Sequence, residues 1–187
     1  MLKTEKLKLV SEWDKTFPQS EKVDHKKVTF VNRYGITLAA DLYKPKNVSG
    51  KYPAIAVSGP FGAVKEQCSG LYAQTMAERG YLTIAFDPSF TGESGGYPRF
   101  MASPDINTED FMAAVDFLSV REDVDPDKIG IIGICGWGGM ALNATALDTR
   151  IKATVASTMY DMTRVNANGY FDSEDSEEAR YAKKQSL

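Results

Sequence analysis

The stretch from Lys128 to Leu142 decides the fold, and it reads KIGIIGICGWGGMAL. Its first half is a short run of β-branched apolar residues, which predicts a buried strand. Its last residues, from Met140 onward, favour a helix. Between the two, four glycines surround one nucleophilic atom, the sulfur of Cys135. The pattern therefore predicts a sharp strand-to-helix turn that exposes the Cys135 side chain.

Cys135 is the candidate nucleophile at this turn. The N–H groups at the start of the helix point toward it, which favours an anionic sulfur and, later, an oxyanion. The residues alone leave an alternative, in which Cys135 is a small buried apolar residue at a strand end. The order strand, glycine, cysteine, glycine, helix favours the nucleophile.

The residues Gly133-Ile134-Cys135-Gly136-Trp137 resemble the nucleophile motif of the α/β-hydrolase superfamily, specifically its dienelactone-hydrolase-like and acetyl-xylan-esterase-like branch. The resemblance implies that the Gly136 N–H contributes to an oxyanion hole, with Phe61 or Gly62 in an earlier loop supplying the second N–H. The sequence departs from the motif at Trp137, where the motif has glycine. We expect the indole, too large for the usual strand–helix contact, to face the pocket or the following segment. Trp137 and Phe61 are thus the predicted substrate-pocket residues.

Strand and helix patterns alternate from residue 52 to 158, which predicts an α/β fold with a mostly parallel sheet and helices on both faces. An antiparallel hairpin over 28–31 and 36–43 precedes it. Further strands are predicted over 53–58, 81–86, 128–134 and 151–158, and helices over 69–79, from an Asn107 cap to about 118, and from about Gly138. Residues 123–127 are predicted to form a turn, and Asp87 and Ser94 to stabilise another by hydrogen bonds.

The chain divides into three predicted parts. Residues 1–26 are an N-terminal arm or short amphipathic helix, with apolar residues at Leu7, Leu9, Val10 and Trp13. Residues 27–159 are the N-terminal part of an α/β-hydrolase domain. Residues 160–187 are the start of a cap or inter-strand segment.

Composition excludes several classes of function. The chain has 187 residues, 43% of them hydrophobic, and a net charge of −3, so no nucleic-acid partner is expected. No apolar run could span a membrane, and the charged N-terminus does not resemble a signal peptide. Two cysteines do not make a disulfide framework, so a cytoplasmic protein is predicted. With one histidine, His25, no metal is expected, and no cofactor either.

In the superfamily, the catalytic acid and histidine follow two further strands, which this sequence does not contain. His25 precedes the hairpin and does not match the family histidine. The chain alone is therefore expected to be inactive, with its sheet truncated after residues 151–158. Three interpretations remain open: part of a cysteine hydrolase for a small-molecule ester or acyl substrate, a non-catalytic ligand-binding scaffold, and an assembly subunit. In the third, a second chain or dimer partner covers the sheet edge near 151–158.

Overall fold

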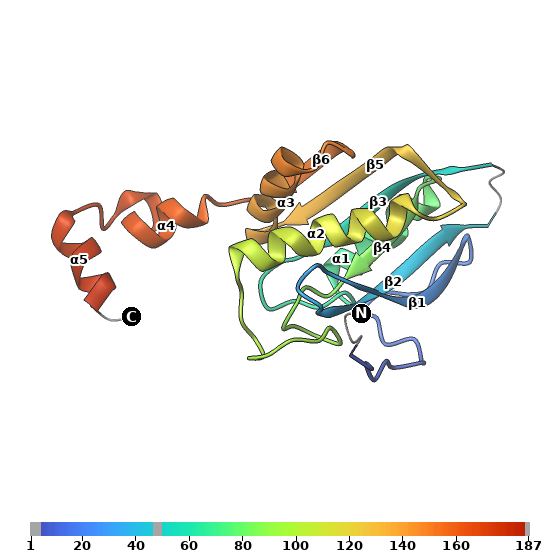
Figure 1. Cartoon of the computed structure of the whole chain (residues 1–187), viewed down its shortest axis with the longest axis horizontal. Coiled ribbons are helices and arrows are strands. Elements are labelled where there is room, and N and C mark those ends of the chain that lie inside the picture. The colour runs from blue at the N-terminus through green and yellow to red at the C-terminus, as the bar shows by residue number, and fades with distance from the viewer. Residues whose placement is uncertain (1–4, 47–49, 186–187) are drawn as a thin grey trace.

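Over the described residues, 5–46 and 50–185, the computed structural model contains one six-stranded sheet with the strand order β1-β2-β4-β3-β5-β6 (Figure 1). The β1–β2 and β2–β4 pairs are antiparallel, and the other three pairs are parallel. This confirms the predicted α/β fold with an antiparallel N-terminal hairpin. The strands are β1 Val23–Val31, β2 Thr37–Pro45, β3 Tyr52–Ser58, β4 Leu82–Phe86, β5 Val124–Ile134 and β6 Ile151–Ser157.

Helices cover both faces of the sheet (Figure 1). Helices α2 (Pro104–Ser119) and α3 (Gly136–Leu147) bury one face together with a core that includes Phe111 and Ile131. Helix α1 (Cys68–Glu78) packs on the opposite face, in a core that includes Tyr43. Because β3, β4 and β5 are apolar on both faces, they form the buried centre of the sheet.

Two helix starts differ from the predictions. Helix α2 is capped by Ser103, whose hydroxyl accepts from the Ile106 N–H, so the prediction of Asn107 as cap is wrong. Asn107 lies one turn inside the helix, where its side chain accepts from the Ser103 N–H at 2.8 Å. Helix α3 begins at Gly136, two residues before the predicted start. Strand β5 also begins early, at Val124, so the predicted turn over 123–127 lies mostly within the strand.

The N-terminal arm contains no helix between residues 5 and 22, so the amphipathic-helix alternative is wrong for this part. Its backbone donors bond to distant segments instead: the Val10 N–H donates to the Glu93 carboxylate, and the Thr16 N–H donates to the Glu66 carbonyl at 2.9 Å. These tertiary partners replace the local bonds that a helix would need. Strand β1 begins at Val23, so the predicted boundary between 26 and 27 falls inside it; residues 1–4 lie outside the described part.

Strand β6 lies at the edge of the sheet and pairs with β5 among the described strands. Val155 is 53% exposed, and beside it lies a cavity of about 440 Å³ whose lining residues are mostly apolar and come mainly from β3, β5 and β6. After β6 the chain extends away from the sheet through α4 (Met162–Asn168), the short helix η1 (Tyr170–Asp172) and α5 (Glu177–Gln185) (Figure 1). Coverage of this edge by another chain stays a prediction.

Candidate active site

Cys135 is the single residue between the end of β5 and the start of α3. Its backbone has φ 58° and ψ −127°, a conformation that residues other than glycine rarely adopt. The Cys135 N–H donates to the Ser157 carbonyl at 2.8 Å, and its carbonyl accepts from the Gly138 N–H at 2.9 Å. Strain of this kind persists where the surrounding structure enforces it, and it is found at functional sites. The position at the carboxyl end of a central parallel strand is the one that the sequence predicts.

The glycines of the turn allow three segments to pack against one another. A Cβ atom on Gly133 would lie 2.2 Å from the Trp137 carbonyl oxygen, so strand and helix are in backbone contact there. A Cβ atom on Gly136 would lie 1.9 Å from the Phe61 ring. The loop after β3 therefore rests directly on the first residue of α3.

That loop, residues 59–67, holds the two predicted oxyanion donors. In the described part of the chain, the N–H groups of Phe61, Gly62 and Gly136 donate no hydrogen bond to another protein group. Pro60 has no N–H to offer. The structure thus brings the Phe61 ring against Gly136, the residue after Cys135. A role for these N–H groups in binding an oxyanion stays a prediction.

Trp137 and Phe61 line the same cavity, which has a volume of about 350 Å³. Their rings lie 5.4 Å apart, and Phe100, Met101 and Arg99 line it too. Trp137 is 3% exposed, and its indole Nε1 has no hydrogen-bond partner among the described residues. Although the family motif has glycine at this position, Trp137 fits because its indole packs against Phe61 in the 59–67 loop. Its role in substrate binding stays a prediction.

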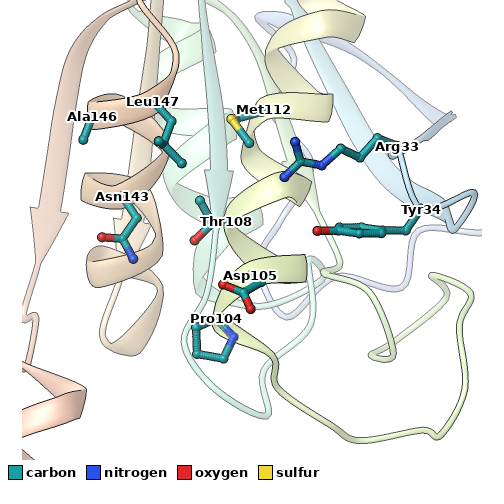
Figure 2. Close-up of a pocket in the computed structure, with 9 residues that line it drawn as sticks. All are labelled: Arg33, Tyr34, Pro104, Asp105, Thr108, Met112, Asn143, Ala146 and Leu147. Atoms are coloured by element: carbon teal, nitrogen blue, oxygen red, sulfur yellow. The ribbon is translucent and has the colours of Figure 1, made fainter.

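A separate hollow of about 370 Å³ lies between α2, α3 and the β1–β2 turn (Figure 2). Arg33 and Tyr34 reach toward it from the turn, and Asp105 and Asn143 come from the two helices. None of the predicted site residues lines it. The structure thus separates this hollow from the strand-to-helix turn at Cys135.

Asp87 and Ser94 shape the turn after β4, as predicted. The buried Asp87 carboxylate accepts from the Lys65 N–H at 2.8 Å and from the Glu93 N–H at 2.9 Å. The Ser94 hydroxyl donates to the Asp87 carbonyl at 2.6 Å and accepts from the Ala39 N–H at 2.8 Å. Both side chains are occupied in holding the turn together.

Lys65 is a residue that the sequence analysis missed. Its side chain is fully buried, and its ammonium lies 2.9 Å from Asp87, 2.7 Å from Glu93 and 2.5 Å from Glu66. Burial alone would lower the pKa of Lys65, but these carboxylates outweigh it and raise the pKa, so the side chain is charged. A lysine in a glycine- and proline-containing loop gives no sequence signal of this environment.

Cys68 also lies nearer the site than the sequence suggested. Its thiol donates to the carbonyl of Gly59, the first residue of the 59–67 loop, at 3.8 Å. Burial raises the pKa of Cys68, and the nearby Cys135 adds to the effect. Because Cys68 directly follows this loop in the sequence, what the tertiary structure adds is the proximity of Cys68 to Cys135.

His25 lies on β1, and its Nε2 is 2.7 Å from the Asp41 carboxylate on β2. Strands β4 and β3 separate β2 from β5, which carries Cys135 at its end. The structure therefore does not bring His25 and Cys135 together.

Asp14 links the N-terminal arm to two lysines. Burial alone would raise its pKa, but hydrogen bonds from Lys15 and Lys27 lower it from 3.8 to about 2. A carboxylate with a lowered pKa stabilises the folded state fully above its unfolded-state value, and this contribution is lost as the pH falls toward 2. We expect the urea midpoint of the natural chain to fall more steeply between pH 4 and pH 2 than that of Asp14→Asn. Parallel curves would contradict this assignment.

The sequence matches a known protein family over most of its length. Residues 34–186 match the X-Pro dipeptidyl-peptidase (S15) family. The chain belongs to this family. The S15-family chain is 73% identical over 168 residues to the uncharacterized protein PA2218 of Pseudomonas aeruginosa, an alignment that covers 89% of this chain and 45% of PA2218. The crystal structure of PA2218 superposes with a TM-score of 0.94 at 67% identity, over 98% of this chain and 57% of that one.

Two other proteins, one sequence relative and one structural neighbour, are also similar to this chain. The thiohydrolase aneE of Aspergillus aculeatus is 31% identical over 137 residues, covering 73% of this chain and 42% of aneE. Acetyl xylan esterase 1 from Thermoanaerobacterium superposes with a TM-score of 0.68 over 96% of this chain and 65% of the esterase, and at 20% identity it shows the fold alone. The α/β-hydrolase-type fold that the sequence resemblance implies is confirmed.

The chain spans about half the length of the curated relatives it matches. Among the helices of the described residues, none has the length and apolar character needed to cross a membrane.

Proposed function

We propose that this chain carries the nucleophile half of a hydrolase for a small-molecule ester or thioester, with Cys135 as the nucleophile. The observation that supports it is the strained backbone of Cys135 between a parallel strand and the start of α3. Similarity to a thiohydrolase favours an acyl substrate. The acid and the histidine of the complete site are proposed to come from sequence outside residues 1–187.

In the proposed reaction, the Cys135 thiol loses its proton to solvent, and the sulfur attacks the carbonyl carbon and forms a carbon–sulfur bond. The carbonyl oxygen becomes an oxyanion that accepts from the N–H of Gly136 and from Phe61 or Gly62. The bond to the leaving alcohol or thiol then breaks, and the leaving group carries away the electron pair. Hydrolysis of the resulting thioester needs a base that delivers water, and a positioned base contributes about 10²–10⁴-fold.

The chain alone is therefore expected to be acylated once without sustained turnover. With p-nitrophenyl acetate, we expect a single acetyl group on Cys135, located by peptide mass spectrometry and absent from Cys135→Ala. Iodoacetamide should modify Cys135 faster than Cys68, because burial raises the pKa of the Cys68 thiol and so lowers the fraction of reactive thiolate at Cys68.

Two results would contradict the proposal in different ways. Sustained ester turnover that Cys135→Ala abolishes would show that the chain supplies its own base. Equal modification of both cysteines in the folded chain, with no acetylation, would instead favour a non-catalytic binding or assembly scaffold. The variant Cys68→Ala is the matched control, since it removes the other thiol and keeps Cys135.

A further inference from the structure

The loop with the candidate oxyanion donors is fixed at two separate points. At its start, the Phe61 ring rests on Gly136 and lies 5.4 Å from the Trp137 ring. At its end, Lys65 binds Asp87 twice, with its backbone N–H at 2.8 Å and its ammonium at 2.9 Å. Phe61 is itself the first attachment and Gly62 lies between the two, so both attachments determine where the N–H groups of Phe61 and Gly62 sit.

Asp87 follows the last residue of β4 directly, so the second attachment ties the loop to the centre of the sheet. The turn after β4 wraps around the Asp87 carboxylate: Glu93 donates its N–H, and a Cβ on Gly92 would lie 2.2 Å from the carboxylate. The Lys65 side chain and Asp87 are both fully buried. The three carboxylates hold the buried ammonium in place. Because Lys65 belongs to the loop, this also fixes the end of the loop.

We propose that Lys65 is a positioning residue for the oxyanion hole, holding the 59–67 loop on Asp87 so that the N–H groups of Phe61 and Gly62 stay beside Cys135. This inference rests on the proposed function of Cys135. Lys65 itself does not contact the substrate, because the Lys65 ammonium is enclosed by Asp87, Glu93 and Glu66. Its effect on the reaction passes through the loop backbone.

Two reactions of the same sulfur separate this role from a general effect on Cys135. Acetylation by p-nitrophenyl acetate passes through an oxyanion: the sulfur–carbon bond forms, p-nitrophenolate leaves, and the thiol proton goes to solvent. Alkylation by iodoacetamide displaces iodide from a saturated carbon and forms no oxyanion. Loss of oxyanion donors should therefore slow acetylation alone.

The test measures both rates on the 187-residue chain and on Lys65→Met, which keeps an unbranched side chain one atom shorter and removes the charge. Since removal of one oxyanion donor costs about 10²–10³-fold in related chemistry, we expect acetylation of Lys65→Met to slow by about 10–100-fold. Alkylation of Cys135 should change by less than about threefold. Circular dichroism and thermal unfolding establish that the variant is folded.

Lys27→Met is the matched control. The Lys27 ammonium binds Glu93 at 2.8 Å and Asp14 at 3.1 Å, in the same charged cluster, but Lys27 belongs to β1 and not to the loop. We expect both rates to stay near those of the natural chain. If Lys65→Met does not fold, Glu93→Gln removes one carboxylate partner of Lys65 and should slow acetylation severalfold.

Three outcomes would overturn the inference: equal slowing of both reactions in Lys65→Met, an unchanged acetylation rate, or the same loss in Lys27→Met. For Glu93→Gln, an unchanged acetylation rate would do the same. Failure of the proposed function gives a different result, since the natural chain itself would then show no acetylation of Cys135.

Discussion

Gly133→Ala should destabilise the chain by about 3 kcal/mol or more, because the added Cβ would lie 2.2 Å from the Trp137 carbonyl oxygen and 2.8 Å from the Ala141 side chain. Backbone of β5 and α3 meets at this point, so the clash cannot be relieved by rotating a side chain. Relief requires α3 to move away from the sheet, which would also displace Cys135. For a chain of this length, the melting temperature should fall by about 6–12 °C.

Gly139→Ala is the control for this prediction, since it is the same substitution six residues further along. Gly139 lies inside α3, and a Cβ there would meet nothing within 4 Å. Alanine is preferred over glycine in a helix interior by about 1 kcal/mol, so this variant should be slightly more stable. Chemical denaturation of both variants measures the difference. Equal stability of the two would show that strand and helix do not touch at Gly133.

Asp110→Ala is expected to cost about 3–5 kcal/mol in the free energy of unfolding, because it removes the acceptor at the centre of a buried polar network. The Asp110 carboxylate is fully buried and accepts from the Ser89 N–H and hydroxyl, both at 2.8 Å. It also accepts from the Asn32 amide at 2.9 Å and the Asn107 amide at 3.0 Å. These donors come from the hairpin turn, the turn after β4 and α2, so the variant should loosen all three.

Asp116→Ala tests whether this loss is specific. Asp116 lies on the same helix but its side chain is 64% exposed, and its ion pair with Arg150 is at the surface. Exposed ion pairs contribute up to about 1 kcal/mol, so the variant should unfold close to the natural chain. Urea denaturation followed by circular dichroism measures both variants. A loss below about 1 kcal/mol in Asp110→Ala would mean that water replaces the carboxylate and that the network is not closed.

The sequence by itself determined the features that depend on neighbouring residues. Apolar runs with β-branched side chains specified the central strands, and the glycines around Cys135 specified the strand-to-helix turn. Asp87 and Ser94 were predicted as turn-stabilising residues and are so in the structure. Each of these signals is local, because strand periodicity and turn chemistry act over a few residues.

The local signals were wrong at the start of α2 and in the N-terminal arm. Asn107 has the chemistry of a helix cap, but its amide is used inside α2 by Asp110, and Ser103 caps the helix. The N-terminal arm has apolar residues at roughly helical spacing, but its N–H groups bond to Glu93 and Glu66. A hydrogen bond to a residue far along the chain leaves no periodic trace in the sequence.

The tertiary structure alone decided what surrounds Cys135. Sheet order brings the loop after β3 beside the end of β5, and this contact places Phe61 on Gly136. The tertiary structure also buries Lys65 among three carboxylates and brings Cys68 close to Cys135. Phe61 and Gly136, more than sixty positions apart, meet because the adjacent parallel strands β3 and β5 end at the same edge of the sheet. Strand pairing sets this geometry, and no local sequence pattern specifies it.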